Sequence, residues 1–158
     1  LIISDTVGFI QKLPTTLVAA FKSTLEEAKD ANLLLHVVDA SHPEHRTQYD
    51  TVNQIINDLN MDQIPQAVIF NKKDLCTEAQ ASTVAKSTYV FVSSRDENDK
   101  DKVKNLMIDE IKRHLNYYEE TVDSVNANRL YFLKQNTLVE ELHFNEESET
   151  YSVKGYKK

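Results

Sequence analysis

Three short apolar runs, separated by segments of helical periodicity, dominate the middle of the chain. The runs are Leu33 to Asp39, Ala67 to Phe70 and Tyr89 to Val92. A continuous apolar run of this length predicts a strand that is buried on both faces of a sheet. Between and after the runs, apolar residues recur every three or four positions, at Tyr49, Val52, Ile55, Ile56 and Leu59, then at Val103, Leu106, Met107, Ile111, Leu115 and Tyr118. This order predicts an α/β fold with three layers and a mainly parallel sheet.

The same alternation extends to the start of the chain. Leu1 to Ser4 is predicted to form a strand, and Thr6 to Pro14 a loop. The apolar spacing of Thr15 to Lys29 is typical of a helix, and Thr77 to Lys86 has the pattern of a shorter one. Because the first residue is a leucine that already belongs to a strand pattern, we expect the sequence to begin inside a larger protein.

A different pattern follows the long helix. Glu119 to Asn128 is predicted to be a polar linker. Beyond it we expect a strand at Leu130 to Leu133, a short helix at Asn136 to Leu142 and a strand at Thr150 to Val153. The expected organisation is therefore a main domain at residues 1–118, a linker at 119–128 and a small α+β subdomain at 129–158.

The composition of the chain limits the kinds of partner that it can bind. The chain has 158 residues, 41% of them hydrophobic, and a net charge of -7. A surface with this excess of acid repels DNA and anionic membranes, so contact with RNA would require a local basic patch. No stretch approaches the roughly 18 apolar residues that span a membrane. The only cysteine, Cys76, cannot form an internal disulfide, which agrees with a cytoplasmic protein.

Glycine is scarce, and this limits nucleotide chemistry. The only two glycines are Gly8 and Gly155, near opposite ends of the chain. A phosphate-binding loop of the form G-x-x-x-x-G-K-[ST] needs glycines so that backbone amides can approach the anion. These residues contain no such loop, so any nucleotide site that they form is expected to be incomplete.

One motif follows a predicted buried strand directly. Asn71-Lys72-Lys73-Asp74 has the form N-K-x-D. Guanine presents a ring N–H and an exocyclic amine on one edge, and a single carboxylate can accept both. Adenine would leave Asp74 unpaired, which is how such a site selects its base. Asn71 can bond the base and join adjacent loops, and the stem of Lys72 can lie over the base plane. A polar turn at a strand exit is the alternative interpretation.

Two weaker signals lie in the expected order around this motif. Asp5-Thr6-Val7-Gly8 has the form D-x-x-G, in which Asp5 is suited to a magnesium-bound water and the Gly8 amide to a terminal phosphate. A simple turn would give the same letters. Ser93-Ser94 ends the next strand, where a backbone amide can reach the carbonyl oxygen of guanine. A helix-capping or loop serine pair is equally compatible with that sequence.

A longer, ordered set of residues resembles one family. Asp5 to Ile10, Leu13-Pro14, Thr24 to Glu27 and the run L-L-L-H-V-V-D-A-S-H-P from Leu33 to Pro43 closely resemble HflX GTPases. The resemblance covers roughly residues 1–118, while the tail beyond Asn128 is only loosely similar.

The resemblance implies a Ras-like P-loop fold and a cytoplasmic GTPase that binds the large ribosomal subunit and acts on stalled or stressed ribosomes. It implies that Asp5 and Gly8 form the magnesium switch, with Mg²⁺ as cofactor and Gly8 contacting the reacting phosphate. It also implies that Asn71, Lys72 and Asp74, with Ser93 and Ser94, bind GTP or GDP. The family's usual serine-alanine is serine-serine here, which is tolerable if only the amide is used. The alternative function is a non-enzymatic module that binds ribosomes or proteins.

The Ras-like strand order also predicts an exposed edge. The strand that carries the phosphate loop would lie between Leu1 to Ser4 and Leu33 to Asp39, and it is missing from these residues. We therefore expect Leu1 to Pro14 to leave the parental arrangement, and the Leu33 to Asp39 strand to offer an edge for non-native dimerisation.

Four further features are given structural roles. His36 is expected to be a satisfied core histidine, Cys76 a small packing residue, and the charge-rich run Arg95 to Lys104 a solvated loop and helix start. The H-x-x-H pair, His42 and His45, lacks a nearby third ligand in sequence, which disfavours zinc.

Overall fold

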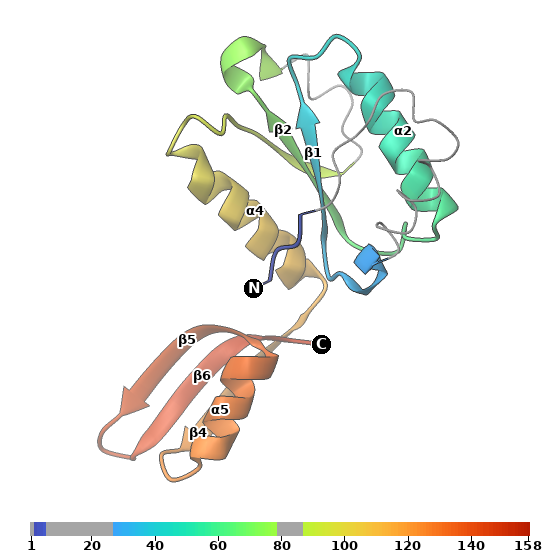
Figure 1. The fold of residues 1–158 in the computed structure, drawn as a ribbon. Helices are drawn as coiled ribbons and strands as arrows, with labels where there is room; N and C mark the ends of the chain where they lie inside the picture. Colours follow the sequence, from blue (N-terminus) through green and yellow to red (C-terminus); the bar gives the residue numbers. More distant parts are fainter. Residues whose placement is uncertain (1, 6–26, 79–86) are drawn as a thin grey trace. The chain divides into compact units, whose positions relative to one another are not determined.

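The computed structural model describes residues 2–5, 27–78 and 87–158 (Figure 1). The chain divides into two compact units, Leu1–Glu110 and Ile111–Lys158. This division falls before the boundary at residue 118 that the sequence predicted. Within the described residues, no helix is long and apolar enough to cross a membrane.

A three-stranded parallel sheet forms the centre of the first unit. It consists of β1 (Leu34–Asp39), β2 (Gln66–Asn71) and β3 (Thr88–Phe91), in the order β1-β2-β3. Leu34 is opposite Gln66 on the next strand, and Ala67 is opposite Thr88. All three predicted strands are therefore present and stay together. Among the described strands β1 lies at an edge of the sheet, as expected.

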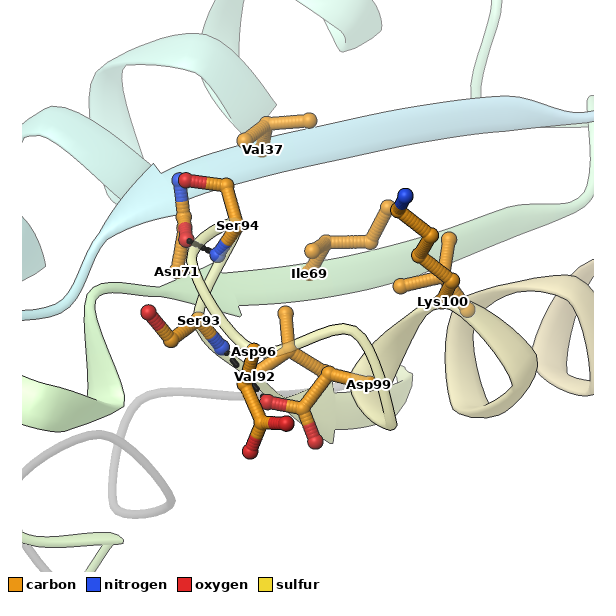
Figure 2. A pocket seen from close by; sticks show the side chains of 10 residues that line it. Val37, Ile69, Asn71, Val92, Ser93, Ser94, Asp96, Asp99 and Lys100 are labelled. Carbon is orange, nitrogen blue, oxygen red and sulfur yellow. Dashed lines mark hydrogen bonds between the residues drawn. The ribbon is translucent and has the colours of Figure 1, made fainter.

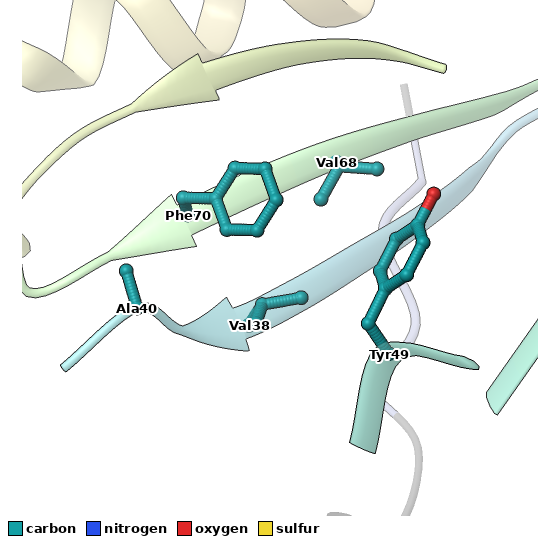
Figure 3. Packing of buried hydrophobic residues seen from close by; sticks show 5 residues of the cluster. All are labelled: Val38, Ala40, Tyr49, Val68 and Phe70. Carbon is teal, nitrogen blue, oxygen red and sulfur yellow. The ribbon is translucent and has the colours of Figure 1, made fainter. Parts of the chain in front are cut away.

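Helices on both faces of this sheet make three layers, as predicted. On one face Val38, Val68 and Phe70 pack with Tyr49 of α2 (His45–Asp58), as Figure 3 shows. On the other face Ala67 and Ile69 pack with Leu106 of α4 (Asp99–Arg113). Burial of each of the valine, leucine, isoleucine and phenylalanine side chains among them stabilises the fold by roughly 1.5–3 kcal/mol. Short 3₁₀ turns, η1 (Glu27–Asp30) and η2 (Lys73–Leu75), complete the described elements of this unit.

The predicted strand at the start of the chain is not formed. Leu1 is outside the described residues, and Ile2 to Asp5 have no regular secondary structure. Ile2 is 93% exposed, so these residues bury little apolar surface. A strand is stable only when a neighbour satisfies its backbone groups, and β1 has no partner on its outer edge among the described strands.

Two predicted helices fall largely outside the described part of the chain. Of Thr15 to Lys29, only η1 is described, as a 3₁₀ turn. Residues 79–86 of the helix predicted at Thr77 to Lys86 are likewise not described. The long helix was predicted to extend to Tyr118, but α4 ends at Arg113 with basic residues in its last turn, where they complement the helix dipole.

The second unit is a three-stranded antiparallel sheet with one helix. It contains β4 (Asn116–Asp123), α5 (Ala127–Asn136), β5 (Leu138–Asn145) and β6 (Thr150–Lys157), with strand order β4-β6-β5. Tyr118, Val122 and Val153 form its core with Leu133 from α5. The α+β class predicted for the tail is confirmed, and so is the strand at Thr150 to Val153.

Three assignments in this unit were wrong. The first half of the predicted linker Glu119 to Asn128 belongs to β4, where buried Tyr118 and Val122 alternate with more polar residues. Leu130 to Leu133 lies in α5 and not in a strand, because Asn126 caps the helix by accepting a hydrogen bond from the Arg129 amide. Most of Asn136 to Leu142 lies in β5 and not in a helix, since it pairs with β6.

Gly155 is required where β5 and β6 pack closely. Its neighbour across the ladder is Val139, next to an irregularity in the register of β5. A Cβ atom at this position would lie 2.3 Å from the carbonyl oxygen of Leu138. The obstructing atom is backbone, so the strand itself would have to shift to admit any side chain.

Candidate functional site

The candidate residues gather at the carboxyl ends of the parallel strands. Asp39 is the last residue of β1 and Asn71 the last of β2, while Ser93 follows β3 by two positions. This is the edge at which open α/β sheets bind ligands. The structure thus brings Asn71, Lys72, Asp74, Ser93 and Ser94 to one place. Figure 2 shows Asn71, Ser93 and Ser94 around a common hollow.

Asn71 links the two loops, as its amide chemistry predicted. Its Oδ1 atom accepts hydrogen bonds from the backbone amides of Lys72, at 2.8 Å, and Ser94, at 3.0 Å. The second bond crosses from the end of β2 to the loop after β3 (Figure 2). The Ser94 amide, expected to face guanine, is thus held by Asn71 in this structure.

Lys72 adopts a backbone conformation that is uncommon for a residue with a side chain. Its φ of 68° and ψ of 39° lie in the left-handed region. Such a conformation costs on the order of 1–2 kcal/mol outside glycine. The Lys72 Nζ atom lies 2.6 Å from Oδ2 of Asp39. Asp39 also accepts bonds from the Ser41 amide, at 3.0 Å, and the Ser41 hydroxyl, at 2.6 Å.

These partners stabilise the charged form of Asp39. Burial alone would raise the pKa of its carboxyl, but the hydrogen bonds from Lys72 and Ser41 outweigh burial and lower the pKa overall. The strand end therefore carries a negative charge that faces the Lys72 ammonium. From the sequence, Asp39 was predicted as the last residue of a strand, without a partner.

Asp74, the proposed base-reading carboxylate, is oriented by Ser93. The Ser93 hydroxyl donates to Oδ1 of Asp74 at 2.7 Å. This bond is the largest cause of the lowered pKa of Asp74. The exposed Arg95 guanidinium lies 3.8 Å from the other oxygen, Oδ2. Ser93 therefore acts through its hydroxyl, whereas the nucleotide-binding interpretation of the sequence used a backbone amide.

A buried carboxylate behind these loops was missed altogether. Asp99, at the start of α4, is 2% exposed, although the sequence suggested a solvated helix start. Its Oδ2 atom accepts the Ser93 amide at 2.8 Å and lies 2.5 Å from the Lys73 Nζ atom. Lys73 also pairs with Asp96 at 2.8 Å. The signal in the sequence that could have indicated this network is the pair Asp96 and Asp99, three and six positions after Ser93.

Two hollows border the site. The first, of about 200 Å³, has an apolar floor that includes Val37 and Ile69 and polar walls that include Asn71, Ser94 and Asp99 (Figure 2). The second, of about 400 Å³, is lined by Ala40, Ser41, His42, Pro43, His45, Leu75 and Cys76. Although two histidines and the cysteine share that lining, the described residues contain no group of three ligands placed to hold a metal ion.

Cys76 and His36 both lie in packing contacts within the first unit. Cys76 packs against the cluster of Val38, Val68 and Phe70, as expected of a small packing residue. His36 stacks on Tyr49 with ring centroids 5.0 Å apart. Burial lowers the pKa of His36 to about 4, so its ring is neutral. Its Nδ1 atom has no hydrogen-bond partner among the described residues, so the expectation of a satisfied histidine was wrong.

The magnesium-switch residues are not tested by this structure. Asp5 is described as an exposed residue outside any helix or strand. Gly8 lies outside the described residues. Their assignment to a metal and a terminal phosphate stays a prediction.

Comparison with known proteins identifies close sequence relatives. A GTPase HflX of Alkalihalophilus pseudofirmus is 39% identical over 155 residues, which are 98% of this chain and 36% of that protein. The GTPase HflX of Flavobacterium psychrophilum is 53% identical over 73 residues, covering 46% of this chain and 18% of that protein. The GTPase HflX of Escherichia coli is 43% identical over 74 residues, which are 47% of this chain and 17% of that protein. The chain thus spans little more than a third of the first relative. No protein-family model matches it.

A solved structure agrees with the fold. A GTP-binding protein from the hyperthermophilic archaeon Sulfolobus solfataricus, in complex with GDP, superimposes with a TM-score of 0.58 and 22% identity, over 69% of this chain and 40% of that chain. At that identity the likeness concerns the fold alone, and it confirms part of a P-loop α/β fold. The sequence matches establish the family, because the match to the first relative covers nearly the whole chain at 39% identity. The chain belongs to the HflX family of GTPases.

Proposed function

We propose that this chain supplies the guanine-reading part of a cytoplasmic GTPase that converts GTP to GDP and phosphate and acts on the large ribosomal subunit or on stressed ribosomes. The ribosomal role rests on the family resemblance. The observation that supports base recognition is the Ser93 hydroxyl bond to Asp74, which orients a carboxylate at the carboxyl ends of the sheet. That carboxylate is still partly exposed, with 35% of its side chain accessible, so a base can reach it.

In this proposal each loop residue has one task. Asp74 accepts the ring N–H and the exocyclic amine of guanine. Asn71 holds the two loops together, and the stem of Lys72 covers the base. The Ser94 amide, which now donates to Asn71, would be shared with or transferred to the guanine carbonyl oxygen.

The phosphate end of the site is proposed from the D-x-x-G motif, the family resemblance and the chemistry of magnesium. Mg²⁺ takes few carboxylates and keeps several waters, and Asp5 offers an exposed carboxylate of the required kind. The Gly8 amide would contact the terminal phosphate. When bound, the ion would neutralise the phosphate oxygens, which is the chemistry that GTP hydrolysis requires.

The 158 residues alone are proposed to be inactive in hydrolysis. They contain no glycine-rich loop with a lysine for the phosphates. Phosphoryl transfer depends on positioning and charge stabilisation of those groups. GTP turnover by the purified 158-residue chain, lost on Asp74→Ala, would contradict this part of the proposal.

Competition between nucleotides tests base recognition directly. The intact protein should bind fluorescent GDP and release it to unlabelled GTP but not to ATP. Asp74→Ala should remove that preference, whereas Asp62→Ala should not, because Asp62 is an exposed acidic residue that precedes β2, at the opposite end of that strand from Asn71. Equal competition by GTP and ATP would reject the guanine assignment and favour a non-enzymatic interaction module.

We also propose that the 158-residue chain self-associates through β1. The outer edge of β1 has no partner among the described strands, and Val37 on that strand is 60% exposed. Unpaired apolar edges recruit other strands. Val37→Lys should therefore lower the mass measured by light scattering at high protein concentration. An unchanged monomer mass for the parent sequence would reject the idea.

A further inference from the structure

Asp99 has more charged partners than a buried carboxylate at a helix start requires. Besides the Lys73 ammonium and the Ser93 amide on Oδ2, the Lys102 ammonium lies 2.8 Å from Oδ1. Only 3% of the Asp99 side chain is exposed. A charge withdrawn from water to this extent is stable only when it is paired and hydrogen-bonded, so its partners are held firmly in place.

Two of these partners adjoin the proposed base-reading residue. Lys73 precedes Asp74 in the chain and is also anchored through its own amide, which donates to the carbonyl of Val92 at 3.0 Å. Ser93 donates its hydroxyl to Asp74 and its amide to Asp99. Asp74 is thus held from both sides by residues that converge on one buried carboxylate.

We propose that Asp99 is a positioning residue for guanine recognition, which it serves by holding Lys73 and Ser93 so that the Asp74 carboxylate meets the exocyclic amine of the base. The proposal rests on the function proposed above, in which Asp74 reads guanine. Asp96 is a secondary anchor, because its carboxylate forms an ion pair with Lys73, whereas it meets Ser93 through the backbone alone, where the Asp96 amide donates to the Ser93 carbonyl at 3.0 Å.

The sharpest readout is discrimination between GDP and IDP. The hypoxanthine base of IDP has the ring N–H and the carbonyl of guanine but lacks the exocyclic amine. A displaced Asp74 would lose the amine contact first, so GDP affinity should fall more than IDP affinity. A general loss of protein stability would lower the affinities for GDP and IDP equally.

The experiment measures dissociation constants for GDP, IDP and ADP with the intact protein. Asp99→Asn should reduce the preference for GDP over IDP by about tenfold, a change typical of a disturbed charged hydrogen bond. Lys73→Met should act in the same direction, and Lys73→Arg should retain most of the preference because the charge remains. Lys104→Met is the control: it removes an exposed ammonium from the same helix without changing the partners of Asp99, and should leave the preference unchanged.

The outcomes separate the two proposals. If the wild type prefers GDP to IDP and ADP, Asp74→Ala abolishes the preference, and neither Asp99→Asn nor Lys73→Met alters it, Asp99 is a structural residue and the inference is overturned. If the wild type shows no preference for GDP, the proposed function itself fails. Should Asp99→Asn not fold, as judged by circular dichroism, Lys73→Met decides the question, since Lys73 is only half-buried.

Discussion

The Lys72 ammonium, extended from a left-handed backbone position, contacts the Asp39 carboxylate at the end of the neighbouring strand, with 2.6 Å between Nζ and Oδ2. The pair joins residues that are far apart in sequence and adjacent across the sheet, since Asp39 is opposite Asn71 in the β1–β2 register. It therefore connects the loop after β1 to the proposed guanine loop. Because the two side chains are 48% and 32% exposed, the pair itself is expected to contribute little to stability.

Asp39→Asn tests whether this pair orients Lys72 rather than stabilises the fold. The variant should change the free energy of unfolding by less than about 1 kcal/mol, as for other exposed ion pairs. GDP affinity should nevertheless fall by a few-fold, because the Lys72 stem then loses the contact that restrains it over the base. Calorimetric titration of the intact protein measures this effect. Glu97→Gln, which breaks the exposed pair with Lys100, is the control and should leave GDP affinity unchanged.

The adjacent serines should respond differently to the same substitution. Ser93→Ala removes the hydroxyl that donates to Asp74 and should reduce the preference for GDP over ADP by about tenfold, since a hydrogen bond to a charged group contributes roughly 1.5–3 kcal/mol. Ser94→Ala should have little effect, because the structure uses the Ser94 amide and an alanine keeps it. The measurement is the pair of dissociation constants for each variant. Equal effects of the two substitutions would contradict the assigned roles.

The sequence was sufficient for the α/β part of the fold but not for the network behind the site. Continuous apolar runs located β1, β2 and β3, because buried parallel strands show no alternation with polar residues. The N-K-x-D letters likewise located Asn71 and Asp74. Asp99 could not be recognised from the sequence, because charge-rich segments are usually solvated. Its burial depends on the Lys73 side chain, which reaches it from another loop.

The second unit was harder to predict because its local signals conflict. Leu130, Tyr131 and Phe132 have strand-like composition, yet the Asn126 cap starts α5 before them. In β4, Glu119 and Glu120 resemble a linker. Within the fold, Glu120 pairs with Arg129 of α5, with 2.6 Å between Glu120 Oε1 and Arg129 Nε, which makes an acidic residue compatible with the helix-facing side of the sheet. Tertiary pairing of this kind overrides local propensity.

Gly155→Ala should destabilise the second unit selectively. The added Cβ would meet the Leu138 carbonyl at 2.3 Å, and relief of that contact requires displacement of β5. We expect a loss of about 1–3 kcal/mol, in the range of overpacked interiors. Hydrogen exchange of amides in β5 and β6 should accelerate, while exchange in β1 to β3 should be unaffected. Ser152→Ala, in the same strand, is the control, and comparable exchange rates in the two variants would contradict the steric argument.

His36 should make the stability of the first unit depend on pH. Burial lowers its pKa from 6.5 to about 4, so between these values the unfolded chain binds a proton that the folded chain does not. The contribution of His36 to the free energy of unfolding is therefore fully present above pH 6.5. It decreases progressively as the pH falls to 4, by at most about 3 kcal/mol. The half-buried ring and its unpaired Nδ1 atom are the physical origin of the effect.

The substitution that isolates this effect is His36→Phe, which keeps an aromatic ring against Tyr49 and removes both the titration and the unpaired nitrogen. Urea unfolding at pH 7.0 and pH 5.0, followed by probes in β1 to β3, should show a smaller difference in the free energy of unfolding for the variant than for the parent chain. His143→Gln, at an exposed position of the second unit, serves as the control and should leave the difference as it is in the parent. If His36→Phe retains the full pH dependence, other groups titrate in this range and the role assigned to His36 is wrong.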